Sequence, residues 1–152
     1  MVYRLILFLL LNFSALAIGG FFTGKGVPSN WYLELIKAPW EPPGWVFGAA
    51  WSTIMICFSI YMSFLWDISK NRKKIMVLFG LQWVLNVGWS PAFFYFRNVI
   101  LGMLIISTLT LLIGYLMHNF RHDLKSKSIL LLPYLIWLVI ATSLNGYILF
   151  NN

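Results

Sequence analysis

Five long stretches of the chain contain no charged side chain, and they limit the possible folds more than any other feature. Each is 20 to 25 residues long, and they cover residues 5–24, 42–66, 75–96, 98–120 and 128–152. A helix needs about 20 apolar residues to cross the hydrocarbon core of a bilayer. Strands of a transmembrane barrel would instead alternate in polarity over segments of about ten residues. The stretches therefore indicate membrane-spanning helices.

Composition excludes a soluble globular domain. Of the 152 residues, 61% are hydrophobic and 10% are charged, whereas typical soluble domains carry about 25% charged residues. So apolar a chain has too little polar surface to cover itself in water. We predict an all-α membrane protein, a five-transmembrane-helix bundle that forms a single domain over residues 1–152. The expected helices cover about 5–22, 44–65, 75–96, 98–117 and 128–150.

The basic residues divide unevenly between the two ends of this bundle. Eight share the side of the N-terminus: Arg4, Lys70, Arg72, Lys73, Lys74, Arg121, Lys125 and Lys127. Three lie on the other side: Lys25, Lys37 and Arg97. The positive-inside rule then places the N-terminus in the cytoplasm and the C-terminus outside, and we expect a bacterial cell membrane. Because basic loops lie well against anionic lipid, the net charge of +7 requires no nucleic-acid partner.

The first predicted helix also has features of a secretory signal. Arg4 precedes an apolar run and the small-residue sequence Ala15-Leu16-Ala17, which is typical of a cleavage site. The apolar run continues to Phe22, however, and is long enough to span a membrane. We expect an uncleaved helix, with removal of residues 1–17 as the alternative.

The connection from Thr23 to Pro43 is too long for a simple turn between two helices. It is rich in glycine and proline, so it cannot form one regular helix, and it also contains Trp31, Tyr32 and Trp40. Long loops in compact domains are usually lids, binding loops or disordered segments. The aromatic residues argue against disorder because they can pack. We predict a lid over the outer end of the bundle.

Aromatic and amide side chains recur at helical spacing inside three of the predicted spans. The stripes are Phe47, Trp51, Met55 and Phe58; Gln82, Asn86, Trp89 and Phe93; and Pro133, Trp137, Ala141 and Asn145 with Leu144 beside them. Amides in hydrocarbon must be hydrogen-bonded, so they should face the bundle interior. They either join helices or line a pocket. Their depth favours a pocket for a flat apolar ligand in the outer half of the bundle, beneath the lid.

The same spans lack the residues that other membrane functions require. None contains Asp, Glu, Lys or Arg, so an ion-coupled transporter has no obvious machinery. His118 and His122 lie near the cytoplasmic end, away from the predicted pocket. We therefore predict no catalytic residues, no metal site and no obligatory cofactor.

Several segments resemble the translocator protein family, also called tryptophan-rich sensory proteins or peripheral-type benzodiazepine receptors. The matching residues are Trp31-Tyr32 through Lys37, Pro39-Trp40-Glu41-Pro42-Pro43, Trp45 through Trp51, Gln82, Asn86, Trp89, Pro91, Phe93-Phe94, Pro133-Tyr134, Trp137, Ala141-Thr142 and Leu144-Asn145. The resemblance covers nearly the whole chain.

The resemblance implies five packed helices, often in a homodimer, with the first long loop closing a cavity. Members bind porphyrins such as protoporphyrin IX, sterols and synthetic benzodiazepine-type ligands. With the stripes above, the expected ligand-binding residues are Trp31, Tyr32, Pro42, Phe47, Trp51, Asn86, Trp89, Phe93, Trp137, Ala141 and Leu144.

Three functions are compatible with this resemblance. The first is a sensor or carrier of a tetrapyrrole, whose ring would stack on Trp51 and Trp137 and whose carboxylates would lie near Lys25, Lys37 and Arg97. The second is an enzyme that degrades the bound porphyrin with light or an oxidant. The third is a regulatory scaffold whose cytoplasmic loops contact a partner.

Overall fold

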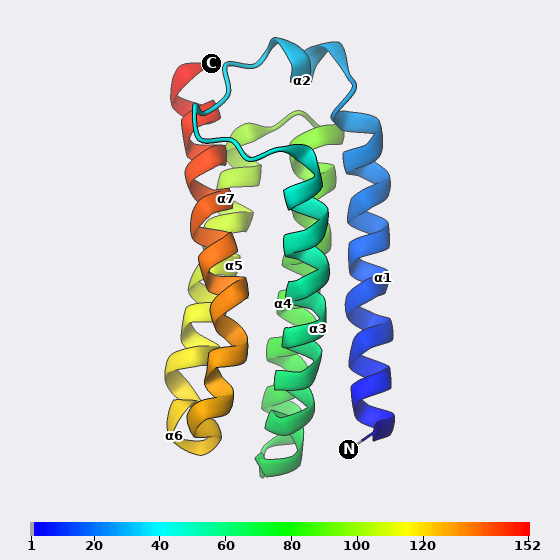
Figure 1. Ribbon diagram of the computed structural model, residues 1–152, viewed down its shortest axis with the longest axis vertical. Coiled ribbons are helices and arrows are strands. Elements are labelled where there is room, and N and C mark those ends of the chain that lie inside the picture. Colours follow the sequence, from blue (N-terminus) through cyan, green and yellow to red (C-terminus); the bar gives the residue numbers. More distant parts are fainter. Residues whose placement is uncertain (1) are drawn as a thin grey trace.

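The computed structural model describes residues 2–152, which form a bundle of five membrane-length helices and no strand (Figure 1). The long helices are α1 (Val2–Gly26), α3 (Gly44–Ile68), α4 (Arg72–Ser90), α5 (Val99–Asn119) and α7 (Leu132–Asn151). Short elements connect them: α2 (Asn30–Glu34), the π-helical turn η1 (Pro91–Tyr95), α6 (Arg121–Leu124) and the 3₁₀ segment η2 (Lys125–Leu131). The predicted all-α bundle of five spans is confirmed.

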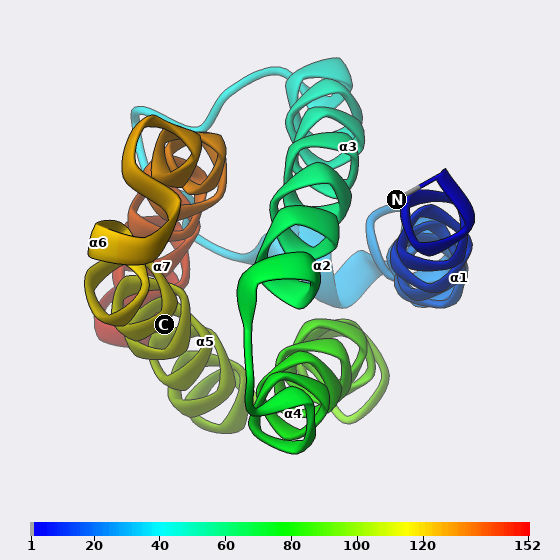
Figure 2. The ribbon, with the colours of Figure 1, turned by 90° about the horizontal axis from the view of Figure 1, so that it is seen from below.

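The helices surround a central region rather than forming a flat layer (Figure 2). Helix α5 packs against α4 and α7, and α1 packs against α3 and α4. Helix α3 also contacts α7, which closes the circle. The C-terminus lies at the same end of the bundle as α2, whereas the N-terminus lies at the opposite end (Figure 1).

Three helix boundaries differ from the prediction by four residues or more. The first helix was expected to end at about residue 22, but α1 continues to Gly26, so the connection to α3 begins later than Thr23. The other two differences have local chemical reasons. The third span was expected to continue to residue 96, but its last part is the π-helical turn η1, which begins at Pro91. Proline has no N–H to donate to the preceding turn, so a wider turn is a common adjustment at this position. The fifth span was expected from residue 128, but α7 begins at Leu132, after the 3₁₀ segment, with Pro133 in its first turn. Proline favours this position because its missing N–H would have no helical partner there.

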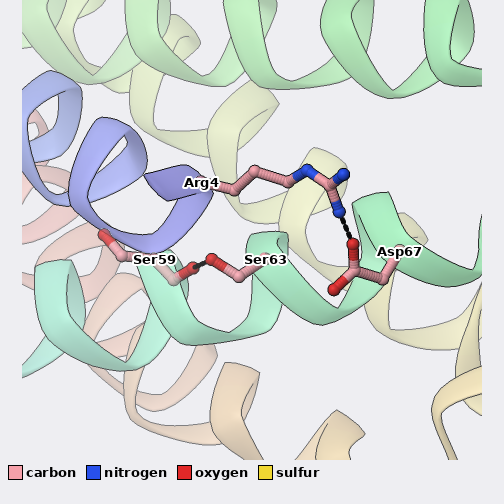
Figure 3. A network of polar contacts seen from close by, with 4 residues as sticks. All are labelled: Arg4, Ser59, Ser63 and Asp67. Atoms are coloured by element: carbon pink, nitrogen blue, oxygen red, sulfur yellow. Dashed lines mark hydrogen bonds and ion pairs between the residues drawn. The ribbon is translucent and has the colours of Figure 1, made fainter. Parts of the chain in front are cut away.

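Polar contacts attach α1 to α3 along the half of the bundle that is far from α2 (Figure 3). Arg4 forms an ion pair with Asp67 at the end of α3. About two turns deeper, Asn12 Nδ2 donates a hydrogen bond to Ser59 Oγ at 2.8 Å. Ser63 Oγ donates to the Ser59 carbonyl at 3.0 Å, a bond within α3 itself. Lipid tails are as apolar as the helix faces, so apolar contact alone does little to favour one helix pair. The polar contacts between α1 and α3 supply the directional bonds that hold this pair together.

A second set of polar contacts joins α4 to α7 in the centre of the bundle. The Tyr134 hydroxyl accepts hydrogen bonds from Gln82 Nε2 at 2.8 Å and from Asn86 Nδ2 at 3.3 Å. Gln82 is fully buried and Tyr134 is 1% exposed. Phe58 packs edge-on against Tyr134 and in parallel with Phe79. This layer of amides and rings separates the packed lower half of the bundle from the half beneath α2.

Candidate ligand-binding site

A cavity of about 590 Å³ lies in the half of the bundle beneath α2. Every long helix contributes to its wall, and so does the connection between α1 and α3. Pockets that bind drug-sized molecules usually have about 300–1,000 Å³ and mainly apolar walls. The cavity therefore has the size and the character of a small-molecule site.

Aromatic rings form two sides of the cavity. Phe47 and Trp51 of α3 line one side, and Trp89 and Phe93 of α4 and η1 line another. The rings of Trp89 and Phe93 are stacked, with centroids 5.1 Å apart and an interplanar angle of 15°. Trp51 meets Tyr134 edge-on at 6.0 Å, which connects this wall to the amide layer below. Flat rings of this kind offer faces on which another aromatic system can stack.

The polar groups of the upper wall are fixed by hydrogen bonds. Asn145 Oδ1 accepts from Trp89 Nε1 at 3.2 Å, and Asn145 Nδ2 donates to the carbonyl of Val99 at 3.2 Å. Gly102 of α5 makes room for this amide, because a Cβ atom there would lie 3.1 Å from Asn145 Oδ1. Asn145 thus holds the Trp89 ring in place and joins α4, α5 and α7.

The end of the cavity nearest α2 is lined by a tyrosine, a lysine and a glutamate. The Tyr32 hydroxyl donates a hydrogen bond to Glu41 Oε1 at 2.9 Å, and Lys37 Nζ lies 4.5 Å from the centre of the Tyr32 ring. Burial, together with this hydrogen bond and the charge of Glu41, raises the pKa of the Tyr32 phenol above its ordinary value. Tyr32 therefore remains a protonated donor at physiological pH.

The connection between α1 and α3 is attached to the bundle at both of its ends. Tyr32 packs against Phe94 of η1, with ring centroids 5.4 Å apart. On the other side, the Ile36 N–H donates to Asn152 Oδ1 at 2.8 Å, and Asn152 Nδ2 donates to the Ile36 carbonyl at 3.1 Å. Trp40 Nε1 donates to Ser143 Oγ at 3.2 Å. The segment thus crosses the end of the bundle and covers the cavity.

The structure brings together nine of the eleven ligand-binding residues proposed from the sequence. The nine that line the cavity are Tyr32, Pro42, Phe47, Trp51, Asn86, Trp89, Phe93, Ala141 and Leu144. Trp31 and Trp137 do not line it. Trp31 instead packs against Phe93, with centroids 5.6 Å apart. Of the three cations expected near a ligand carboxylate, only Lys37 lines the cavity.

Trp137 lies beside the cavity wall because of its position on α7. It is 6% exposed, and its ring meets Phe47 edge-on at 5.2 Å. Residues four apart drift by roughly 40° around a helix with 3.6 residues per turn, so a run of such steps leaves one face. The α7 residues that line the cavity are Leu138, Ala141, Leu144, Asn145 and Ile148. Alternating steps of three and four join Leu138, Ala141, Asn145 and Ile148, which keeps these residues on one side.

Helix α1 supplies a wall that the sequence did not identify. Ala15 and Gly19 are absent from the expected ligand-binding residues, yet both line the cavity. A Cβ atom on Gly19 would lie 3.2 Å from Ser90 Oγ of α4. Gly19 therefore lets α1 approach α4 closely and also lines the cavity. Small residues carry no chemical signature of binding, and only the arrangement of helices reveals this role.

Comparison with known proteins places this architecture in a family. Residues 7–150 match the model of the TspO/MBR family. The chain belongs to the TspO/MBR family.

Relatives of this TspO/MBR family member come from all three domains of life. It is 34% identical to a tryptophan-rich protein TspO of Chlorobaculum tepidum over 88% of this chain and 86% of the relative. It is 33% identical to a protein of the same name from Archaeoglobus fulgidus, over 88% of this chain and 87% of the relative. The translocator protein of Homo sapiens is 31% identical over 82% of this chain and 75% of its own length. The family resemblance expected from the sequence is confirmed, and the chain is a multi-pass membrane protein.

Proposed function

We propose that this protein binds a flat, largely apolar ligand of the tetrapyrrole class in the cavity beneath α2 and acts as its sensor or carrier. The observation that carries the proposal is the cavity of about 590 Å³ itself, walled by rings from α3 and from α4–η1 and covered by the α1–α3 connection. Rings with exposed faces favour a planar aromatic ligand over a branched aliphatic one.

The polar groups of the cavity support the same ligand class. Lys37 lines the cavity beside Tyr32, at the end nearest the aqueous phase. An ammonium group there suits a ligand carboxylate, while the rest of the ligand lies deeper among apolar walls. Asn86 lines the deeper part and is already bonded to Tyr134, so it leaves an amide oxygen for a ligand N–H.

Titration of the purified protein with protoporphyrin IX tests this proposal. We expect saturable quenching of tryptophan fluorescence at one ligand per chain, because the ring would stack against Trp51 and Trp89. Absorbance spectra should keep the porphyrin bands both in the dark and under illumination. Loss of the bands only under light would instead favour a degrading enzyme. An absence of saturable binding would contradict the proposal.

We also propose that the N-terminus faces the cytoplasm and that the α2 end of the bundle faces outward, in a bacterial cell membrane. Eight basic residues lie at the N-terminal end and three at the α2 end. A reporter that is active only outside the cytoplasm should therefore be active when fused after Asn152. The same reporter placed in the link between α3 and α4 should be inactive. The reverse pattern would overturn this orientation.

A further inference from the structure

A second hollow of about 320 Å³ lies on the outside of the bundle, between the end of α1 and the turn that joins η1 to α5. Lys25, Ser29, Tyr95 and Arg97 are among its lining residues. Phe94 lines both this hollow and the central cavity, so its ring forms the wall between them. We call the outer hollow the α1–η1 groove.

The α1–η1 groove is lined by two cations and no acidic side chain. Within residues 2–152 the one ion pair joins Arg4 to Asp67, so Lys25 and Arg97 have no carboxylate partner in that part of the chain. Both cations lie near aromatic faces instead. Lys25 Nζ is 4.1 Å from the centre of the Phe21 ring, and Arg97 Cζ is 6.0 Å from that of Trp31. Because Lys25 lies in the last turn of α1, its charge also offsets the negative end of the helix dipole.

Arg97, the second cation of the groove, has an unusual backbone conformation. Arg97 has a φ angle of 52°, a left-handed conformation that favours glycine and is uncommon for other residues. A glycine would terminate η1 without this cost. Strained residues of this kind cluster at ligand-binding positions. Glycine is therefore the substitution at position 97 that best retains this backbone.

The charge pattern of the sequence indicates that the groove lies near the membrane surface. Lys25 directly follows the first uncharged stretch, which ends at residue 24, and Arg97 separates the stretches that end at 96 and begin at 98. The rings beside the groove remain exposed, with Phe21 57% and Tyr95 70% accessible. Aromatic residues at this depth lie among lipid headgroups and the upper parts of acyl chains.

We propose that the α1–η1 groove binds the phosphate headgroup of an anionic phospholipid from the leaflet at the α2 end. Lys25 and Arg97 contact the headgroup, and the exposed rings of Phe21 and Tyr95 pack against its glycerol and upper acyl chains. The site is distinct from the central cavity and does not depend on what that cavity binds. A bound lipid would lie directly against the outer face of the Phe94 wall.

Native mass spectrometry of the full chain in neutral detergent tests the proposal with dioctanoyl phosphatidylglycerol and dioctanoyl phosphatidylcholine as probes. We expect one phosphatidylglycerol to bind preferentially. Each basic residue near an anionic headgroup contributes a factor of roughly five, so the double variant Lys25→Gln/Arg97→Gly should lose about 25-fold in affinity. Glycine at 97 retains the left-handed backbone and so preserves the fold.

A matched control is available at the other end of the bundle. Lys125 also has a left-handed backbone, with φ of 49°, and Lys70 is an exposed cation in the link between α3 and α4. The variant Lys70→Gln/Lys125→Gly removes the same number of charges and should retain the affinity. Equal losses in both double variants would show general attraction to charge and overturn the site. Equal binding of the two lipids, or displacement of phosphatidylglycerol by equimolar inorganic phosphate, would also overturn it.

Discussion

Replacing Trp51 with alanine is expected to weaken the binding of protoporphyrin IX by at least about twofold to tenfold. Trp51 lines the central cavity and is only half-buried, so its ring is available to a ligand. Loss of an aromatic partner costs about 0.5–1.5 kcal/mol beyond the loss of buried area, and each 1.4 kcal/mol is tenfold in affinity. The dissociation constant from fluorescence titration measures the effect.

Two other tryptophans provide comparison variants for this experiment. Trp66→Ala removes a ring in the last turn of α3, far from the cavity, and should leave the affinity unchanged. Trp137→Ala removes a buried ring that packs against Phe47. It should lower the unfolding temperature, because it leaves an empty space in the core, and it should weaken ligand binding less than Trp51→Ala does. Equal affinities of the Trp51 and Trp66 variants would show that the cavity is not the binding site.

Replacing Gly26 with alanine is expected to destabilise the protein by about 1–3 kcal/mol, the usual cost of overpacking. A Cβ atom at this position would lie 2.2 Å from Phe94 Cδ1 and 2.5 Å from Phe94 Cβ, so α1 or η1 must move. For a chain of this size, each kcal/mol lowers the unfolding temperature by about 2–4 °C. Thermal unfolding in detergent, followed by circular dichroism, measures this shift.

Gly24 provides the control for the Gly26 variant, because it lies on the same last turns of α1. A Cβ atom there would meet nothing within 4 Å. Alanine is also the better helix former by about 1 kcal/mol, so Gly24→Ala should leave the unfolding temperature unchanged or raise it. If both alanine variants unfold at the same temperature, the contact between Gly26 and Phe94 does not limit the packing of α1 on η1.

The spans were predictable because charged residues mark their ends, and asparagine caps add to this at two of them. Asn71 Oδ1 accepts a hydrogen bond from the Lys74 N–H at 3.0 Å, and Asn98 Oδ1 accepts from the Leu101 N–H at 2.9 Å, so both residues cap helices. The π-helical turn after Ser90 was not predictable. Pro91 excludes a regular helical hydrogen bond, but the sequence does not specify whether the chain bends, breaks or widens there.

Cavity-lining residues were predictable from the sequence only where their spacing alone places them on the helix face that lines the cavity. Asn86, Trp89 and Phe93 are separated by three and four residues and all line the cavity, as expected. On α7 the regular spacing of four suggested Trp137, although the face that lines the cavity is centred on Ala141 and Asn145. Regular spacing shows which residues share one side of a helix. Whether that side lines the cavity or packs against another helix depends on how the helices are arranged.

The hydrogen bonds between α4 and Tyr134 also have a consequence for how the chain is made. Gln82 and Asn86 precede Tyr134 by 52 and 48 residues, so at about 5–20 residues per second the ribosome supplies their acceptor roughly 2–10 s later. During that interval α4 carries two amide groups into the membrane without their final partner. The hydrogen bonds of the central layer can therefore form only after the last span has been made.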